Sequence, residues 1–449
     1  MKRVITYGTF DLFHEGHRRL LERARNLGEY LIVGVTTEGY DDSRGKLNVR
    51  ESLIKRIEHV KESGLADEII IEEYEGQKIN DIQKHSIDIF AIGSDWKGKF
   101  DYLNEYCTVV YLERTKGISS SQIRAASNGV IRMGVVGYGR IANRFVPEAR
   151  FVSGVNIEGV FGPSVSKMEN FIKHHQLSFA DKDFNSFLHK VDAIYIASPH
   201  LSHYEYTMKA LEQQKHVLCE KPMVLRRHEA EKLFSVAKQN GCLLLEGIKT
   251  AYAPGFNRMI ALAKSGAIGD IKSIEATFTK LAEENSRELK RDSAGGSISE
   301  LASYPLLAVV KLLGEKYIEF DQFSYIDSIT GIDLFNKINI RYKDAIATVK
   351  VALGVKSEGD LVISGTKGYV YVPAPWWKTE YFETRFENPT NNRKYYQAFA
   401  GEGLRYELSE FVSLVQRDLL STYKLSESDS IWIADVIEKL REGKCRKLI

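Results

Sequence analysis

A glycine-rich turn near the middle of the chain constrains the fold more than any other feature. Residues 131–136 read IRMGVV, an apolar run that is typical of a buried strand, and GYGRIA follows at residues 137–142. A strand, a glycine turn and a helix start bring backbone N–H groups and a helix N-terminus to one point, as a dinucleotide pyrophosphate requires. A glycine turn with a purely structural role is the alternative. The residues expected to hold the cofactor at this turn are Gly137, Tyr138, Gly139, Arg140 and Ile141.

A second segment suited to phosphate binding comes just before this turn. Residues 114–121 read RTKGISSS, which is rich in hydrogen-bond donors; a polar loop that caps a helix is the alternative interpretation. With 449 residues the chain is too long for one hydrophobic core, so two or three domains are expected. RTKGISSS would be the last part of one nucleotide site along the chain, and the glycine turn would be the first part of another. We therefore expect two enzymes on one chain.

The residues before these segments alternate between strand and helix patterns. This alternation favours an α/β domain, with a parallel sheet, helices on both faces and ligands at the carboxyl ends of the strands. The expected strands are residues 3–7, 30–35, 69–71 and 87–92, and the expected helix is residues 18–27.

The HEGH sequence at residues 14–17 follows the first expected strand. His14 and His17 would share one helical face near the ligand edge, where both could donate hydrogen bonds to a triphosphate. A surface pair or a helix cap is the alternative. A metal pair would need a third ligand, and none stands nearby in the sequence.

Three motifs together resemble the glycerol-3-phosphate cytidylyltransferase family, a branch of the HxGH nucleotidyltransferases. They are GTFDLFHEGH, IGSDWKGKFDYL and RTKGISSSQIR, and they fall in the family's order within residues 1–128. The resemblance implies a Rossmann-like domain in which an alcohol phosphate attacks the α-phosphorus of CTP and pyrophosphate leaves with Mg²⁺. Arg56 falls where relatives carry a basic residue. Gly64 stands where close relatives carry an arginine, which leaves the acceptor alcohol open.

The resemblance also implies the residues of the transferase site. Catalysis is expected from His14, His17 and Arg114. The residues expected at CTP are Gly8, Thr9, Phe10, His14, His17, Lys46, Asp95, Trp96, Arg114, Thr115, Ser119 and Ser120.

The chain after the glycine turn continues to alternate between strands and helices. Strands are expected at residues 155–161, 191–197 and 216–219, with a helix at residues 203–211. This pattern favours a doubly wound nucleotide-binding domain. From about residue 253 alternating strands dominate, such as residues 273–278 and 345–351.

EKP at residues 220–222, after ASPHLSH, is similar to the Gfo/Idh/MocA oxidoreductase family. GAIG, GGSISE and GTKGY follow at residues 266–269, 295–300 and 365–369. The resemblance implies a dinucleotide-binding Rossmann domain at residues 131–252. It also implies an α+β substrate and dimerisation domain at residues 253–449, with an open, mainly antiparallel sheet.

The family resemblance makes Lys221 the catalytic lysine, with a solvated strand-end lysine as the alternative. Tyr304 takes the acid/base position, and a neighbouring Lys⁺ would lower its pKa toward working pH. A core tyrosine on an amphipathic helix at residues 301–313 is the alternative, and Glu300 replaces an aspartate. His203 could be only a helix-start residue. The other residues expected at the cofactor are Ser164, Ser198, Pro199, His200, His203, Glu220 and Lys221.

The expected second strand of this domain ends without the acid that an NAD site usually presents to the ribose. FGPS stands there at residues 161–164, while Lys167 and Arg140 offer donors to a 2′-phosphate. The sequence therefore favours NADP(H) slightly over NAD(H).

Composition excludes several other classes of function. The net charge of +2 gives no basis for binding nucleic acid or a membrane, and four scattered cysteines suggest neither a zinc site nor a disulfide framework. No apolar run suits a membrane helix or a signal peptide, so a cytoplasmic location is expected. A homodimer or homotetramer is expected from the family resemblance.

These observations predict a bifunctional enzyme. It would reduce a phosphorylated keto or aldo sugar to a polyol phosphate and join that product to CMP from CTP. The product, CDP-glycerol or a CDP-polyol, would serve a cell-surface polymer such as a capsule or teichoic acid. An oxidoreductase domain that acts on the CDP-linked product, or a non-catalytic dimerising or binding module, is the alternative. A nucleotide-sensing regulator lacks any recognisable DNA-binding element.

Overall fold

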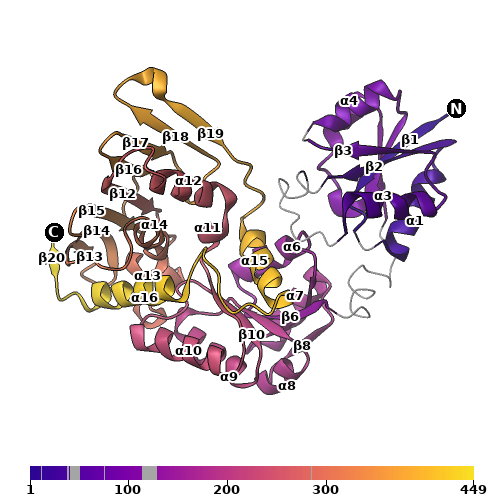
Figure 1. Cartoon of the computed structure of the whole chain (residues 1–449). Helices are drawn as coiled ribbons and strands as arrows, with labels where there is room; N and C mark the ends of the chain where they lie inside the picture. The colour runs from indigo at the N-terminus through magenta and orange to yellow at the C-terminus, as the bar shows by residue number, and fades with distance from the viewer. Residues whose placement is uncertain (12, 38–39, 41–50, 75, 114–128, 285) are drawn as a thin grey trace. The chain divides into compact units, whose positions relative to one another are not determined.

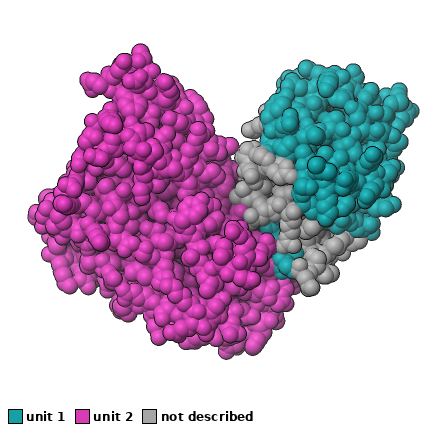
Figure 2. All heavy atoms as spheres, in the orientation of Figure 1, with its two compact units in different colours: residues 1–130, 151–156 teal, residues 131–150, 157–449 magenta. Residues whose placement is uncertain are grey.

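The computed structural model divides into two compact units (Figures 1 and 2). Unit 1 comprises residues 1–130 and 151–156, and unit 2 comprises residues 131–150 and 157–449. The further boundary between residues 252 and 253 stays a prediction. The structure describes residues 1–449 except 12, 38–39, 41–50, 75, 114–128 and 285.

The described part of unit 1 is built on one parallel sheet in the order β3-β2-β1-β4-β5. Its elements are β1 (Arg3–Gly8), α1 (Glu15–Arg25), β2 (Tyr30–Thr36), α3 (Leu53–Glu62), β3 (Glu68–Glu72), α4 (Gln77–Lys84), β4 (Ile89–Gly93) and β5 (Thr108–Leu112). Val4 and Ile5 are neighbours in β1 but belong to two separate hydrophobic clusters, one on each face of the sheet. Both faces are therefore covered. Gly34 allows this packing because a Cβ there would overlap the ring of Tyr7.

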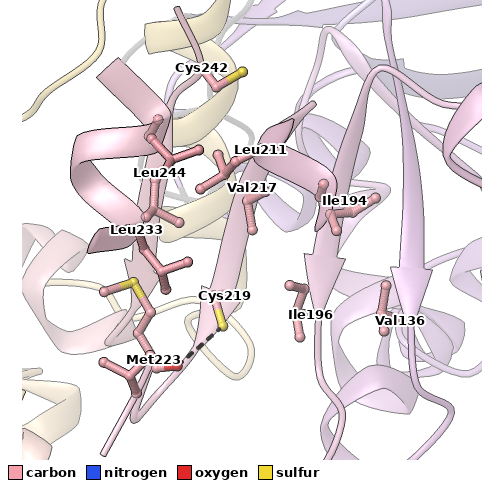
Figure 3. Packing of buried hydrophobic residues seen from close by; sticks show 14 of the residues in the cluster. Val136, Ile194, Ile196, Leu211, Val217, Cys219, Met223, Leu233, Cys242 and Leu244 are labelled. Atoms are coloured by element: carbon pink, nitrogen blue, oxygen red, sulfur yellow. Dashed lines mark hydrogen bonds between the residues drawn. The ribbon is translucent and has the colours of Figure 1, made fainter. Parts of the chain in front are cut away.

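Unit 2 begins with a second doubly wound sheet, ordered β11-β10-β9-β6-β7-β8 among the described strands. Its strands are β6 (Ile131–Val136), β7 (Val155–Phe161), β8 (Phe179–Asp181), β9 (Ala193–Ile196), β10 (His216–Glu220) and β11 (Leu244–Gly247). Its helices are α6 (Arg140–Ala149), α7 (Val165–His175), α8 (Phe184–His189), α9 (His203–Glu212) and α10 (Arg227–Gln239). Figure 3 shows Ile194, Ile196 and Val217 from neighbouring strands packed in one apolar core with Leu233 of α10.

The rest of unit 2 is organised around a mixed sheet of nine described strands, ordered β19-β18-β17-β16-β12-β15-β14-β13-β20. They are β12 (Ile271–Thr279), β13 (Glu319–Ile326), β14 (Asp333–Arg341), β15 (Ile346–Ala352), β16 (Leu361–Gly365), β17 (Gly368–Val372), β18 (Tyr381–Phe386), β19 (Arg393–Tyr396) and β20 (Arg446–Leu448). Only the β12–β15 and β13–β20 pairs are parallel among the described pairings. The predicted α/β fold with a mainly antiparallel C-terminal sheet is confirmed.

The helices of this part differ from the sequence prediction at one place. They are α11 (Lys249–Tyr252), α12 (Pro254–Lys264), α13 (Ser297–Leu301), α14 (Ser303–Leu313), α15 (Leu404–Gln416) and α16 (Glu427–Glu442). The helix predicted at residues 301–313 is divided at Ala302, and α14 is buried around nearly its whole circumference rather than amphipathic. Among the described residues no single helix is long and apolar enough to cross a membrane. The bent pair Arg291–Leu301 and Ser303–Leu313 passes on length and composition alone.

Candidate functional site

The first candidate site lies where β1 ends and α1 begins. His14 is the N-cap of α1, and its Nδ1 accepts hydrogen bonds from the backbone N–H groups of Gly16 at 3.1 Å and His17 at 3.4 Å. The two imidazole rings stack with centroids 3.8 Å apart. Because Nδ1 is the acceptor, the neutral ring of His14 carries its proton on Nε2, which makes that nitrogen a donor.

Gly16 is the residue that lets the ring of His14 fold back over the helix start. A Cβ at this position would lie 2.9 Å from Cε1 and 3.0 Å from Nδ1 of His14. Any larger residue would push the ring away and break the cap. The glycine inside HEGH therefore has a steric role in positioning the first histidine.

A buried arginine fixes the loop that leads to these histidines. Arg56 is fully buried and donates from Nη1 to the carbonyl oxygens of Thr9 and Thr36, each at 2.8 Å, and from Nε to that of Glu51 at 3.0 Å. Phe10 is held at φ 53, and its ring lies 5.4 Å from that of His17. Arg56 thus positions the loop from inside the unit.

The other predicted transferase residues fall into two groups. Trp96 is half-buried at the carboxyl end of β4, next to β1 in the sheet, and packs on Phe100 with ring centroids 5.7 Å apart. Gly64 lies in the turn between α3 and β3, at the amino ends of the strands rather than at the carboxyl end that carries His14, and its bearing on the acceptor alcohol stays a prediction. The side chain of Asp95 and the residues Lys46, Arg114, Thr115, Ser119 and Ser120 lie outside the described residues.

The second candidate site is a cavity of about 1000 Å³ in unit 2. The glycine turn forms one wall. Gly137 has φ 101, and a Cβ there would meet the carbonyl oxygen of Ala197 at 2.8 Å. Gly139 is the N-cap of α6, which has no side-chain cap. The predicted cofactor residues that line this cavity are Gly137, Tyr138, Gly139, Arg140, Ile141, Ser198, Pro199, His200, His203, Glu220 and Lys221.

The three residues predicted to contact a 2′-phosphate differ in their position relative to the cavity. Ser164 does not line the cavity, although its backbone N–H donates to the hydroxyl of Tyr138 at 3.3 Å. Lys167 is exposed on α7. Arg140 lines the cavity with its side chain largely exposed, and it pairs with Glu288 at 3.0 Å. Of the three, Arg140 is the one that the structure brings to the cavity.

Lys221 and Tyr304 lie near one another in the cavity wall. Nζ of Lys221 donates to the carbonyl oxygen of Glu300 at 2.8 Å and lies 5.7 Å from the ring centroid of Tyr304. Burial, followed by the negative charges of Glu220 and Glu407, raises the pKa of Tyr304 far above its ordinary value. The predicted lowering of this pKa by a lysine is therefore wrong, because desolvation and two carboxyls outweigh it.

The two histidines after β9 have separate surroundings. His203 is the first residue of α9, with Nδ1 3.0 Å from the carbonyl oxygen of Pro222 and Nε2 2.8 Å from that of Ser198, so it ties two strand-end loops together. His200 has Nδ1 3.7 Å from Oε1 of Glu300. Burial, and next the charge of Lys221, lowers the pKa of His200 well below its ordinary value. A neutral His200 can accept a hydrogen bond inside the cavity.

Several residues of the cavity wall were not predicted. Trp377 stacks on Phe278 with ring centroids 3.7 Å apart, and Lys249 and Lys378 line the same cavity. They reach the cavity from α11, β12 and the 3-10 turn Trp376–Lys378, far apart in the sequence. The adjacent Trp376 and Trp377 were the one feature of the local sequence that could have indicated this part of the wall.

No group of three or more His, Cys, Asp or Glu side chains able to hold a metal occurs among the described residues. The described side chains of both sites are instead rich in hydrogen-bond donors.

Family models match the chain in three successive places. The model described as cytidylyltransferase-like matches residues 5–126. The model described as an oxidoreductase family with an NAD-binding Rossmann fold matches residues 131–248, and the GFO/IDH/MocA C-terminal domain matches residues 256–371. The matches do not overlap: His14 and His17 fall within the first, Lys221 within the second and Tyr304 within the third.

Individual relatives divide in the same way. The chain is 56% identical over 124 residues to glycerol-3-phosphate cytidylyltransferase of Bacillus spizizenii, covering 28% of this chain and 95% of the relative. It is 23% identical over 323 residues to trans-1,2-dihydrobenzene-1,2-diol dehydrogenase of Danio rerio, covering 69% and 96%. The solved structure of KijD10, a 3-ketoreductase from Actinomadura kijaniata in complex with NADP and TDP-benzene, matches with a TM-score of 0.64 and 20% identity, over 71% of this chain and 99% of that chain.

Proposed function

The chain belongs to the glycerol-3-phosphate cytidylyltransferases through its first unit and to the Gfo/Idh/MocA oxidoreductases through its second, and we propose that the two activities act in sequence to make a CDP-linked alcohol. A cytidylyltransferase is thus fused to an NAD(P)-dependent oxidoreductase, as the sequence predicted. The reductase produces a polyol phosphate from a phosphorylated keto or aldo sugar. The transferase then joins that polyol phosphate to CMP.

The transferase step depends on donors placed at the phosphates of CTP. A phosphate oxygen of the alcohol phosphate attacks the α-phosphorus, and pyrophosphate leaves with the Mg²⁺ that accompanies CTP. Nε2–H of His14 donates to the phosphate oxygens as their charge increases, while the cap at Nδ1 holds the ring and its tautomer. His17, stacked against His14, donates beside it. No covalent enzyme intermediate is required.

The reductase step needs a hydride, which the nicotinamide supplies when bound, and a proton, which the protein supplies. Lys221 holds the substrate oxygen. Tyr304 keeps its phenolic proton because burial raises its pKa, so it can donate a hydrogen bond to the substrate oxygen, while Lys221 supplies the proton. A neutral acid beside the reacting oxygen suits reduction of a carbonyl better than oxidation of an alcohol.

The observation that carries the proposal is a pair of lysines in the cavity wall. Burial lowers the pKa of Lys249 against the opposing charges of Glu407, Glu402 and Glu220, and the positive charge of Lys378 adds a smaller lowering. Two lysines in one cavity wall favour a substrate that carries an anionic group there. The phosphate of a sugar phosphate is such a group, which favours reduction before CMP transfer. Dihydroxyacetone phosphate is the smallest substrate of this kind, and pentulose phosphates are larger ones.

A CDP-linked substrate is the second candidate. The KijD10 structure holds a nucleoside diphosphate compound together with NADP, and the cavity here has a volume of about 1000 Å³. In that case the transferase would act first. The two lysines would then face a diphosphate instead of a phosphate monoester.

Two variants of the full chain distinguish the orders. Lys221→Ala should block NADPH oxidation but still convert a supplied polyol phosphate and CTP into the CDP product. His14→Ala should oxidise NADPH with a ketose phosphate and release no pyrophosphate. Oxidation of NADPH by the wild-type protein only after a CDP adduct has formed would show that the proposed order is wrong.

A further inference from the structure

His200 in unit 2 has two ring nitrogens with different surroundings. The residue lines the cavity and is only 7% exposed. Its Nδ1 is buried, has no hydrogen-bond partner among the described residues and lies 3.7 Å from Oε1 of Glu300. Since Nδ1 is turned toward this carboxyl group, Nε2 is the ring nitrogen on the cavity side.

The carboxyl group that faces Nδ1 is held in its ionised form by an arginine. Nη2 of Arg287 lies 2.8 Å from Oε1 and 3.0 Å from Oε2 of Glu300. An ionised carboxylate accepts hydrogen bonds and cannot donate them, so it favours the imidazole form that carries a proton on the nitrogen facing it. In a neutral ring the other nitrogen is then an acceptor. His200 therefore presents an acceptor, Nε2, to the cavity.

Glu300 also fixes the position of Lys221. Its carbonyl oxygen accepts a hydrogen bond from Nζ of Lys221 at 2.8 Å. Under the proposed function this lysine holds the carbonyl oxygen of the substrate. One residue thus positions a donor, Nζ of Lys221, and orients an acceptor, Nε2 of His200, in the wall of one cavity. An α-hydroxy carbonyl compound offers the complementary pair, because its carbonyl oxygen accepts and its hydroxyl group donates.

We propose that Nε2 of His200 accepts a hydrogen bond from the substrate hydroxyl on the carbon next to the reacting carbonyl, and that Glu300 is the positioning residue that fixes this tautomer. The reductase then takes α-hydroxy carbonyl compounds, a class that includes ketose and aldose phosphates. The inference rests on the proposed reduction for its substrate, whereas the tautomer does not depend on it. The amide N–H group of a nicotinamide is also an uncharged donor, and a measurement of cofactor binding distinguishes it from the hydroxyl.

The tautomer is tested first in the full-length protein without ligands. Proton–nitrogen NMR correlation spectra distinguish protonated from unprotonated ring nitrogens, and the signals lost in His200→Gln identify those of His200. The wild-type protein should carry a proton on Nδ1 and none on Nε2 at neutral pH. Glu300→Gln should shift the population toward the Nε2–H form, because the new amide can donate to Nδ1.

A matched change in the same cavity wall is the control. Glu402→Gln alters a carboxylate that pairs with Arg144 at 3.6 Å, and it should leave the signals of His200 unchanged. A proton on Nε2 in the wild-type protein would overturn the proposal, whether or not Glu300→Gln folds. An unchanged tautomer in folded Glu300→Gln would overturn the role of Glu300.

Two related substrates test the hydroxyl contact. Dihydroxyacetone phosphate carries the hydroxyl, whereas hydroxyacetone phosphate lacks it and keeps the carbonyl and the phosphate. His200→Leu should lower kcat/KM for the first compound about tenfold, the loss of one hydrogen bond, and for the second about twofold or less. His200→Gln should recover part of the loss because its amide oxygen can accept.

NADPH titrations of the same variants should give an unchanged Kd. An equal loss of kcat/KM for both compounds, or weaker NADPH binding in His200→Leu, would overturn the hydroxyl contact and assign Nε2 to the cofactor. If the wild-type protein reduces neither compound, the proposed sugar phosphate substrate fails, whereas the tautomer of His200 is decided by the spectra alone.

Discussion

Each of the two units has a helix N-terminus at the carboxyl edge of a parallel sheet. The two helix starts differ in whether a side chain caps them. In unit 1 the start of α1 is already capped by Nδ1 of His14, so the ligand would meet an imidazole donor. In unit 2 the start of α6 has Gly139 as its N-cap and no side-chain cap, so the ligand would meet backbone N–H groups.

The difference follows from what each phosphate does. The phosphates of CTP gain charge as pyrophosphate leaves, and a side-chain donor held by its own cap can stabilise that change. The pyrophosphate of a dinucleotide is unaltered by hydride transfer, so it needs only a fixed cradle. Under the proposed function, the same layout would serve catalysis in one unit and binding in the other.

Loss of the imidazole donors should give the largest effect. His14→Ala or His17→Ala is expected to lower pyrophosphate release by about 10²–10³-fold for each donor lost, while NADPH binding to unit 2 is unchanged. His85→Ala, elsewhere in unit 1, is the control. Near-normal CTP turnover in both variants would contradict the role of the HEGH histidines.

The two glycines of the cradle should separate folding from binding. At Gly137 an alanine needs a left-handed φ and meets the backbone of residue 197, which should lower the free energy of unfolding by about 1–3 kcal/mol. At Gly139 a Cβ meets no described atom within 4 Å, so Gly139→Ala should keep Tm and weaken NADPH binding about tenfold or more. Thermal melts and fluorescence titrations measure both. Equal losses of Tm in the two variants would contradict the distinction between a folding role for Gly137 and a binding role for Gly139.

Unit 2 is expected to bind its substrate through side chains, as unit 1 is proposed to bind CTP. Lys378→Met should raise KM for a phosphorylated sugar about tenfold, the loss of one charge-assisted hydrogen bond. The same variant should leave an unphosphorylated analogue unaffected. Steady-state kinetics with the two substrates measure this difference. An equal change of KM for both would contradict a contact between Lys378 and the substrate phosphate.

Cofactor choice should show the smallest effect. If Arg140 meets a 2′-phosphate, NADPH binds a few-fold more tightly than NADH, by a margin that falls with added salt. Glu288→Gln should widen that margin because Glu288 now pairs with Arg140. Titrations of both nucleotides at two salt concentrations measure this margin. A preference for NADH would contradict the inference of NADP(H) from the absence of an Asp or Glu at the end of the second strand.

Motifs with local spacing predicted most of the fold. The glycine turn, HEGH and EKP all stand at strand ends as expected, since strand and helix periodicity is a local property. The helical spacing was recognised only over residues 18–27, whereas α1 runs from Glu15 to Arg25; HEGH was expected at the helix start, and His14 is its N-cap. The β5 strand was missed.

The cavity wall could be predicted only in part. Lys249, Phe278 and Lys378 come together only through tertiary packing, so no spacing in the sequence relates them. The pKa of Tyr304 was predicted in the wrong direction for the same reason, because burial and distant carboxyls decide it. Sequence motifs identify the reaction class, whereas packing determines the protonation states.

The ion pair between Glu148 and Arg405 has a consequence for how the chain is made. It joins α6, which follows the glycine turn, to α15, a helix translated much later. At roughly 5–20 residues per second, synthesis from one to the other takes on the order of tens of seconds. Residues 1–130 can fold as a unit on the ribosome during that time. The oxidoreductase must instead wait for its partner helix, with an incomplete core exposed to chaperones and proteases.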